Sequence, residues 1–388
     1  VVQLRSETKI KAVSPTQWNS LSGSEFPFSE HAFLAALEES SCVGEESGWL
    51  PCHLTLWEKQ KLQGAICLYE KNNGYGEYIF DWGWAKAYEQ HGLNYYPKLV
   101  SAIPFTPATG SKLLVHPGAD MENVRKKLLE GALASMRDRQ CTSLHFLFIT
   151  AEELPAFTAM GFLIRHSFQF HWKNNNYRDF TDFLSTLKGK RRKEILRERR
   201  QIEQQMINVE VLEGEAILPE HINKMFLFYL STTDKKWGQS YLSADFFQCL
   251  YTKMRERMVL ILAYAEGECV AGTINFKKGN CLYGRYWGCN RNYRSLHFEL
   301  CYYQPIEYSI CHGISLFEAG AQGEHKIQRG FLPELTYSAH WLEHPGFRNS
   351  IAKFLEEEKQ AISRGIEEFR PHSPYRETVP FPEEDERS

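Results

Sequence analysis

The chain has 388 residues, of which 43% are hydrophobic and 14% aromatic, and a formal net charge of −3. This length exceeds what one hydrophobic core usually supports, so two domains are expected. The small net charge excludes a general attraction to nucleic acid or to an anionic membrane, so such contacts must come from local patches. The ten cysteines form no CxxC pair and no regular spacing, which favours a reduced compartment and makes a metal site unexpected.

No stretch of the chain is predicted to enter a membrane. The N-terminal residues VVQLRSETKIKAV lack the apolar core of a signal peptide, and the most apolar window, Met258 to Ala265, has the length of a strand. We therefore expect a soluble, cytoplasmic protein. From Pro371 onward the chain is rich in proline and glutamate, so residues 371–388 are expected to form a flexible tail.

The first half of the chain begins with strand signals and continues with a helix and another strand. Alternating apolar residues in HLTLWEKQKLQGAICLY predict a hairpin around Gly64. The aromatic stretch from Tyr75 is predicted to be a strand that ends at Trp82-Gly83. The later elements are a helix over 121–139, a strand over 143–148, and a segment from Gly161-Phe162-Leu163 to His171-Trp172.

A basic segment opens the second half. KGKRRKEILRERR, from Lys188 to Arg200, has eight basic residues against Glu194 and Glu198, and it is predicted to be a helix that runs to Met206. Such a run is usually a solvated helix face. Contact with an anionic partner is the alternative, and its binding would weaken steeply with salt.

The second half then repeats the order of the first. A hairpin around Gly272 leads to an aromatic strand ending at Trp287-Gly288, and a helix over 298–311 leads to a strand over 314–317. Gly330-Phe331-Leu332 precedes His340-Trp341; 330 minus 161 and 341 minus 172 both give 169. This equal spacing indicates one duplicated unit, whereas two unrelated α/β domains with coincidental residue pairs are the alternative.

Three strands, a helix, a strand, a helix and a final strand resemble the GNAT acetyltransferase superfamily, and two copies in one chain resemble the Fem-type aminoacyltransferases. Longer blocks, among them YGEYIFDWGWAKAYEQHGLNYYPKL, LHFELCYYQPIEY and GAQGEHKIQRGFLP, are similar to the bacterial FemAB-like family of predicted N-acyltransferases, which carries a peptidoglycan label. The resemblance covers nearly the whole chain. It implies an α/β (α+β) protein with two tandem GNAT-like domains, each a mixed, mostly antiparallel sheet flanked by helices, over 1–176 and 177–370.

The resemblance also implies a reaction. It is the transfer of an acyl or aminoacyl group from an activated donor, aminoacyl-tRNA or acyl-CoA as co-substrate, to the amine of a small or peptide acceptor, with no tightly bound cofactor and no metal. Fem-type enzymes bind the acceptor largely in the first domain, which points to Asp81, Trp82, Tyr95, Tyr96 and Lys98. Tyr286, on the strand lining the cleft, is a further candidate, while an aromatic core is the plain alternative.

The densest set of ionisable residues lies between Leu316 and Trp341. The resemblance places Lys326 where Fem-type enzymes have a lysine that contacts the reacting end of the donor, although Ile327 stands where an aromatic residue is expected. Lys326 would stabilise the donor or the oxyanion. The proton of the amine would go to Glu299, Glu318 or His325, although a histidine alone is more often structural and Glu299 can equally favour a helix dipole.

Donor phosphates need cations or a glycine-rich loop. Neither copy has the GNAT phosphate loop: residues 115–120 contain Pro117 and Asp120, and residues 290–295 contain no glycine. This weakens acyl-CoA as the donor. The candidate phosphate ligands are Arg285, Arg291, Arg294 and Arg329. A tRNA would use the helix from Lys188 to Arg200. The rival to an enzyme is a non-catalytic module that recognises a cell-wall peptide or nucleic acid.

Overall fold

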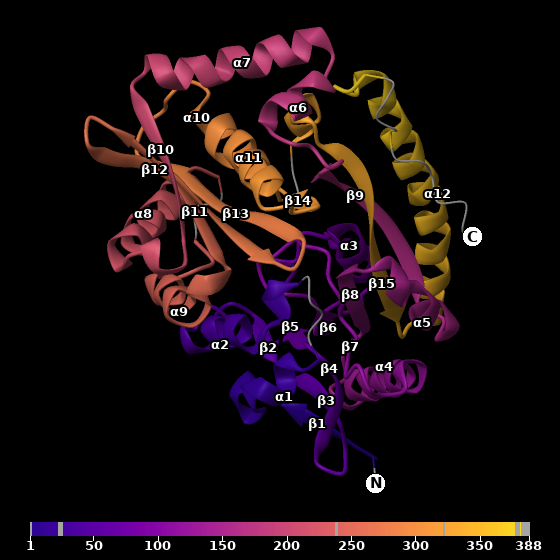
Figure 1. Ribbon diagram of the computed structural model, residues 1–388. Coiled ribbons are helices and arrows are strands. Elements are labelled where there is room, and N and C mark those ends of the chain that lie inside the picture. The colour runs from indigo at the N-terminus through magenta and orange to yellow at the C-terminus, as the bar shows by residue number, and fades with distance from the viewer. Residues whose placement is uncertain (1, 22–25, 237–239, 321–322, 377–380, 382–388) are drawn as a thin grey trace. The chain divides into compact units, whose positions relative to one another are not determined.

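The computed structural model describes residues 2–21, 26–236, 240–320, 323–376 and 381 (Figure 1). The chain forms two compact units. Unit 1 comprises residues 1–167 and 335–362, and unit 2 comprises residues 168–334 and 363–388. The division falls inside two strands, β9 (Leu163–Lys173) and β15 (Leu332–Leu342), rather than at the single boundary near residue 176 that we expected.

Unit 1 contains a hairpin, a mixed set of strands and the helices α1 to α5. Its strands are β1 (Val2–Glu7), β2 (Trp49–Pro51), β3 (His53–Glu58), β4 (Lys61–Ile66), β5 (Tyr69–Lys71), β6 (Lys98–Ser101), β7 (Leu114–Val115) and β8 (Ser143–Ile149), with most of β15. Its helices are α1 (Pro15–Asn19), α2 (His31–Glu39), α3 (Trp82–Gln90), α4 (Met121–Asp138) and α5 (Leu154–Ala159). Strands β1-β3-β4-β7 form one sheet, and β2-β5-β6-β8-β15 are neighbours in another.

The helix over 121–139 and the strand over 143–148 are confirmed as α4 and β8. The apolar face of α4 packs on the hairpin because Leu128, Leu129 and Ala132 share one buried cluster with Leu56 and Ile66. Asp120 caps α4 by accepting the backbone N–H of Asn123. β6 runs parallel to β8, whereas its pairing with β5 is antiparallel.

The predicted aromatic strand ending at Trp82-Gly83 is wrong. Residues 75–81 form no strand, and Trp82 is the first residue of α3. Gly76 and Tyr78 have φ of 80° and 64°, which an extended strand does not allow. The strand that runs parallel to β8 is β6, so the true counterpart of the second aromatic strand lies about one helix further along the chain.

Unit 2 contains the strands β10 (Ile207–Glu213), β11 (Met258–Ala265), β12 (Glu268–Lys278), β13 (Cys281–Cys289) and β14 (Leu316–Glu318), with part of β9. Its helices are α6 (Phe180–Ser185), α7 (Gly189–Gln204), α8 (Pro219–Lys236), α9 (Ala244–Met254), α10 (Leu296–Phe298), a π-helix (Glu299–Tyr303), α11 (Gln304–Cys311) and a 3-10 helix (Glu324–Arg329). Helix α12 (Pro345–Phe369) begins in unit 1 and ends in unit 2. The basic helix is confirmed as α7, but it ends before Met206, which is 82% exposed.

The sheet of unit 2 is covered on both faces (Figure 1). β10 to β13 are antiparallel neighbours, β14 runs parallel to β13, and β9 runs antiparallel to β14. On one face, Ile261 packs with Leu296 and Leu300. On the other, a Cβ added to Gly272 would lie 2.4 Å from the sulfur of Met225, so this glycine is needed for the close approach of α8.

The duplication is visible in the last strand of each copy. β9 spans 163–173 and β15 spans 332–342, so both ends differ by 169 residues. Each follows a glycine with positive φ, Gly161 at 79° and Gly330 at 97°. The two strands have nevertheless changed places: β15 pairs with β8, and β9 pairs with β14. The segment 316–341 is therefore divided, with residues up to 334 in unit 2 and the rest in unit 1.

The expected tail is partly packed. Tyr375 is 4% exposed and donates a hydrogen bond to the carbonyl oxygen of Gly330, 2.7 Å away. Residues 377–380 and 382–388 of the expected tail lie outside the described residues, and so does Ala321.

Candidate functional site

In unit 2 a parallel pair of strands ends beside a buried lysine. β13 and β14 pair from Cys281–Tyr283 to Leu316–Glu318; β14 then ends, while β13 runs on to Cys289. Ligands in open α/β sheets bind at the carboxyl ends of parallel strands where neighbouring chains diverge. The 3-10 helix Glu324–Arg329 follows this strand end and carries Lys326.

Lys326 is 1% exposed, and its Nζ donates to the carbonyl oxygen of Gly320 at 2.6 Å. Burial, helped by the nearby charge of Arg285, lowers the pKa of Lys326 to about 7. A lysine in this state exchanges a proton near neutral pH, which an ordinary lysine does not. The assignment of Lys326 to catalysis remains a prediction; the structure shows that its amine is buried beside the end of β14.

His325 points toward aromatic neighbours. Its Nε2 lies 2.8 Å from the hydroxyl of Tyr302, and its ring lies 5.9 Å from that of Phe298. The ring of His297 lies 6.1 Å from that of His325. The Tyr302 hydrogen bond occupies one ring nitrogen of His325 and orients the ring.

Arg329 forms a buried ion pair with the basic helix. It is 4% exposed, and its Nη2 lies 2.9 and 3.2 Å from the carboxylate oxygens of Glu198. Glu198 also accepts a hydrogen bond from Tyr303, and the guanidinium of Arg329 lies 3.4 Å from the ring centroid of Phe298. The charge of Arg329 is thus compensated inside unit 2, which argues for a structural role instead of the expected phosphate contact.

Glu318 ends β14 next to a histidine. It is 5% exposed, and its carboxylate lies 4.0 Å from Nε2 of His171 on β9. Burial and the charges of Lys173 and Lys326 lower the pKa of His171 to about 3, so this imidazole is neutral. Sequence reasoning did not assign His171 to the second unit because it precedes the boundary.

Glu299 lies on the side of the π-helix that faces α7. Its Oε1 accepts hydrogen bonds from Arg199 Nη2 at 3.1 Å and from Gln304 Nε2 at 2.8 Å. Burial raises its pKa, and Arg199 opposes that shift. Glu299 and Lys326 share no hydrogen-bond partner among the described residues, so the structure does not join these two predicted catalytic residues.

The remaining predicted donor residues are scattered. Arg285 is half-buried on β13 and close enough to influence Lys326. Arg291 and Arg294 are exposed, and Arg291 donates to the hydroxyl of Tyr293 at 2.5 Å. Tyr286, predicted to bind the acceptor, is 7% exposed and packs against the rings of Tyr229 and Phe247, so it belongs to the core between β13 and the helices α8 and α9.

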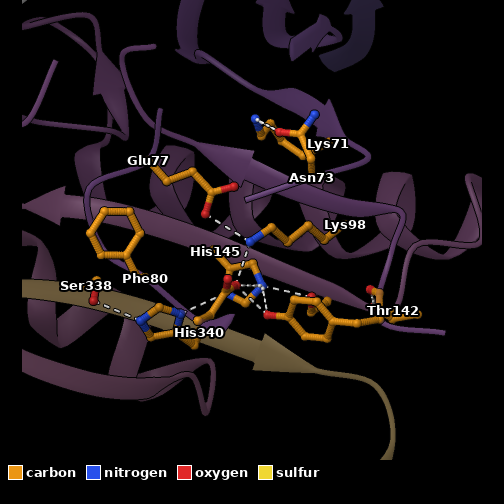
Figure 2. A network of polar contacts seen from close by, with 12 residues as sticks. Lys71, Asn73, Glu77, Phe80, Lys98, Thr142, His145, Ser338 and His340 are labelled. Atoms are coloured by element: carbon orange, nitrogen blue, oxygen red, sulfur yellow. Dashed lines mark hydrogen bonds and ion pairs between the residues drawn. The ribbon is translucent and has the colours of Figure 1, made fainter. Parts of the chain in front are cut away.

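Unit 1 contains a buried ionic network where the acceptor was expected (Figure 2). Lys98 Nζ donates to Asp81 at 2.5 Å and to Glu77 at 2.9 Å, and the hydroxyl of Tyr95 donates to the same Asp81 oxygen at 2.5 Å. Burial favours the neutral amine, but the two carboxylates outweigh it and raise the pKa of Lys98. Burial raises the pKa of Glu77 to about 6.

The network continues through two histidines. His145 Nδ1 lies 2.7 Å from Nδ1 of His340, so one ring must donate and the other accept. Nε2 of His145 lies 2.7 Å from the Ser143 hydroxyl, and Nε2 of His340 lies 2.8 Å from that of Ser338 (Figure 2). Burial holds the pKa of both histidines well below the usual range. Lys71, nearby, donates to the carbonyl oxygen of Tyr75, and burial lowers its pKa to about 7.

Three of the five predicted acceptor residues of unit 1 therefore bind one another. Asp81, Tyr95 and Lys98 are each at most 4% exposed, whereas Trp82 is 53% exposed and stacks on Phe80 with ring centroids 4.3 Å apart. Tyr96 is half-buried. Sequence reasoning missed Glu77, Lys71, His145 and His340. For His145 the available signal was a polar residue inside an otherwise apolar strand, SLHFLFI.

Comparisons with known proteins identify one family and several solved structures of similar fold. A FemAB-like family model, described as peptidoglycan biosynthesis/recognition, matches residues 9–377. The structure is similar to L-PGS from Bacillus licheniformis, at 12% identity and a TM-score of 0.51, covering 85% of this chain and 96% of that one. FemX gives 11% identity and a TM-score of 0.51, covering 88% and 98%.

A conserved protein of unknown function from Bacteroides thetaiotaomicron gives 10% identity and a TM-score of 0.53, covering 87% of this chain and 99% of that one. At such identities these likenesses concern the fold alone. No curated protein matches the chain. In the part of the chain that the structure describes, no helix combines the length and the apolar composition needed to cross a bilayer.

Proposed function

Since this chain belongs to the FemAB-like family, we propose that it is an N-acyltransferase that moves an acyl or aminoacyl group from an activated donor onto an amine. The observation that carries the proposal is the buried Lys326 amine at the end of the parallel strands β13 and β14. The family description favours a peptidoglycan peptide as the acceptor. We place the reaction in the cytoplasm, where both classes of donor are found.

In the proposed reaction the acceptor nitrogen attacks the carbonyl carbon of the donor. An amide C–N bond forms and the ester C–O or thioester C–S bond breaks. With a pKa of about 7, Lys326 is partly neutral and can take the proton that the amine loses. The resulting ammonium then lies beside the developing oxyanion, which it stabilises, and it returns the proton to the leaving group.

Two classes of donor, aminoacyl-tRNA and acyl-CoA, fit this reaction, and one experiment distinguishes them. Helix α7 has exposed cations at Lys190, Lys193, Arg197 and Arg200, which would suit the phosphates of a tRNA. The loop over 290–295 contains no glycine for an acyl-CoA pyrophosphate. These features favour aminoacyl-tRNA over acyl-CoA.

The test is transfer to a peptide amine, measured with charged tRNA and separately with an acyl-CoA panel. For Lys326→Met we expect a loss of about 100-fold or more, the scale of acid–base catalysis. Lys326→Arg should fail as well, because arginine stays protonated. The wild-type rate should rise with pH and level off above about 7, the pKa of Lys326.

The matched control is Lys353→Met, which removes an exposed lysine of unit 1 and should leave the rate unchanged. Full activity of Lys326→Met would remove Lys326 from the reaction. Turnover with neither donor class would overturn the enzyme proposal and favour a binding module.

A further inference from the structure

The 3-10 helix Glu324–Arg329, which carries Lys326, depends on distant residues for its position. It has six residues, and 3-10 helices have weaker hydrogen-bond geometry than α-helices. The glycines at its two ends, Gly323 and Gly330, have φ of 115° and 97°. Glycine adopts such values without strain, so the local sequence does not fix the direction of the chain at either end. Contacts from elsewhere in unit 2 must orient the helix.

A segment close to the C-terminus supplies one of these contacts. The hydroxyl of Tyr375, which is 4% exposed, donates to the carbonyl oxygen of Gly330 at 2.7 Å. The N–H of Gly330 in turn donates to the carbonyl oxygen of Ile327 at 3.2 Å. The next N–H, that of Phe331, donates to the carbonyl oxygen of Lys326 itself at 3.3 Å. Tyr375 therefore holds the turn that closes on Lys326.

Residues 373–376, which we call the C-terminal strap, are themselves fixed beside the start of the basic helix. Tyr375 forms an antiparallel bridge with Leu187, two residues before α7. Two backbone hydrogen bonds of 2.8 and 2.9 Å flank the bridge. The Nζ of Lys188 also donates to the carbonyl oxygen of Ser373, at 2.8 Å. Because the strap is held at several points, the hydroxyl of Tyr375 has a defined position and can anchor the turn.

The ring of Tyr375 completes the packing around the same turn. Tyr375 belongs to the buried cluster that contains Phe183, Ile327 and Phe331. A Cβ added to Gly330 would lie 2.8 Å from the ring of Phe183 and 3.0 Å from the Tyr375 hydroxyl, so the turn is tightly enclosed. Burial raises the pKa of Tyr375 well above its usual range, so the hydroxyl remains a donor throughout the experiments below.

We propose that Tyr375 is a positioning residue for Lys326: through the carbonyl group of Gly330 it holds the 3-10 helix where the Lys326 amine is buried. This inference rests on the proposed function, because it concerns the residue to which the proton transfer is attributed. Burial lowers the pKa of Lys326, and Arg285 on β13 and Cys301 on the π-helix are the ionisable groups that also act on it. Release of the helix would let water reach the amine, and its pKa would rise toward 10.5.

The experiment is a titration of the full chain by nuclear magnetic resonance, with lysine labelled by a carbon isotope at Cε and without any acyl donor. The resonance that disappears in Lys326→Met identifies Lys326. We expect its pKa to be about 7 in the wild type and about 8 or higher in Tyr375→Phe, which keeps the ring and removes the hydroxyl. An unchanged pKa in Tyr375→Phe would overturn the proposal.

The matched control is Tyr308→Phe. Tyr308 is another buried tyrosine of unit 2, and its hydroxyl donates at 2.7 Å to a different partner, Glu213 on β10. The pKa of Lys326 should stay near 7 in this variant, because the anchor at Gly330 is intact. An equal rise in both variants would also overturn the proposal, since it would follow from the loss of any buried hydroxyl in unit 2.

Transfer activity provides a second readout. At pH 7 a pKa of about 8 leaves about 9% of the amine neutral, against about 50% in the wild type, so Tyr375→Phe should be about fivefold slower. At pH 9 the two rates should nearly agree, because both amines are then mostly neutral. A loss of the same size at both pH values would contradict a role in positioning Lys326. Absence of turnover with either donor class would overturn the proposed function, whereas the lysine titration would still decide the role of Tyr375.

Discussion

Lys98 in unit 1 and Lys326 in unit 2 are both buried, with 0% and 1% of their surfaces exposed, yet their pKa values move in opposite directions. Lys98 has two carboxylate partners, and its pKa rises in spite of burial. Among the described residues Lys326 donates to one carbonyl oxygen, that of Gly320, and burial lowers its pKa to about 7. The partners therefore decide whether a buried lysine is a fixed charge or a proton acceptor. The first site is thus a buried ion pair, whereas the second is the one to which the proposed proton transfer is attributed.

The largest expected effect comes from removing the fixed charge. Lys98→Met leaves Glu77 and Asp81 buried without their cation and should lower the free energy of unfolding by about 3–5 kcal/mol. Urea unfolding at pH 7 measures this. The matched control, Lys173→Met, breaks a pair with Glu334 in which the lysine is 56% exposed, and it should cost at most about 1 kcal/mol. Equal losses in the two variants would contradict the assignment of the network to stability.

The opposite result is expected for Lys326. Its pKa is 10.5 in the unfolded chain and about 7 in the folded one, so between about pH 7 and 10.5 the folded state binds fewer protons, and at pH 7 the lysine destabilises it. Lys326→Met should therefore raise the free energy of unfolding by about 1–3 kcal/mol at pH 7, after the loss of the Gly320 hydrogen bond. The gain should shrink as pH rises from 7 to 10.5. A destabilised variant would mean that Lys326 is a structural ion like Lys98.

The smallest effect concerns the histidine pair of unit 1. Burial keeps His145 and His340 neutral in the folded state, whereas the unfolded chain protonates them below about pH 6.5. Stability should be complete above that pH and fall below it, by up to about 1.4 kcal/mol per pH unit for each neutral histidine. Unfolding of the wild type at pH 7.5 and 5.5 measures the slope.

His340→Asn is the variant for this test. It removes one titrating group, so the pH dependence of the free energy of unfolding should lose the contribution of one histidine. His171 in unit 2 contributes equally in the wild type and in the variant. His145, Arg165, Asp81 and Lys98 are the ionisable groups that act on His340, and none of them is substituted in this variant. An unchanged slope would show that the pair does not control the acid stability of unit 1.

Much of the fold followed from patterns along the chain. Side-chain periodicity or a glycine turn is enough to predict several features: the hairpin around Gly64, helix α4, strand β8, the basic helix α7 and the 169-residue offset of β9 and β15. The family resemblance was equally readable. The strand expected before Trp82 failed because an aromatic run suggested extension while the positive φ at Gly76 and Tyr78 required a turn.

Partnership between distant residues depended on the folded chain. Two strands of equal length and pattern can occupy either position, and only tertiary packing put β15 beside β8 and β9 beside β14. Because of that exchange, His340 on β15 lies beside His145 on β8, and the ionisable segment around Lys326 is divided between the two units. Likewise, Arg329 and Lys326 lie three residues apart and look alike as cations in the sequence. Of these two cations, Glu198 pairs with Arg329, whereas Lys326 donates to the carbonyl oxygen of Gly320 in the described part of the chain. The sequence determines which residues carry a charge. Whether a buried charge has an opposite charge beside it depends on the packing of distant residues.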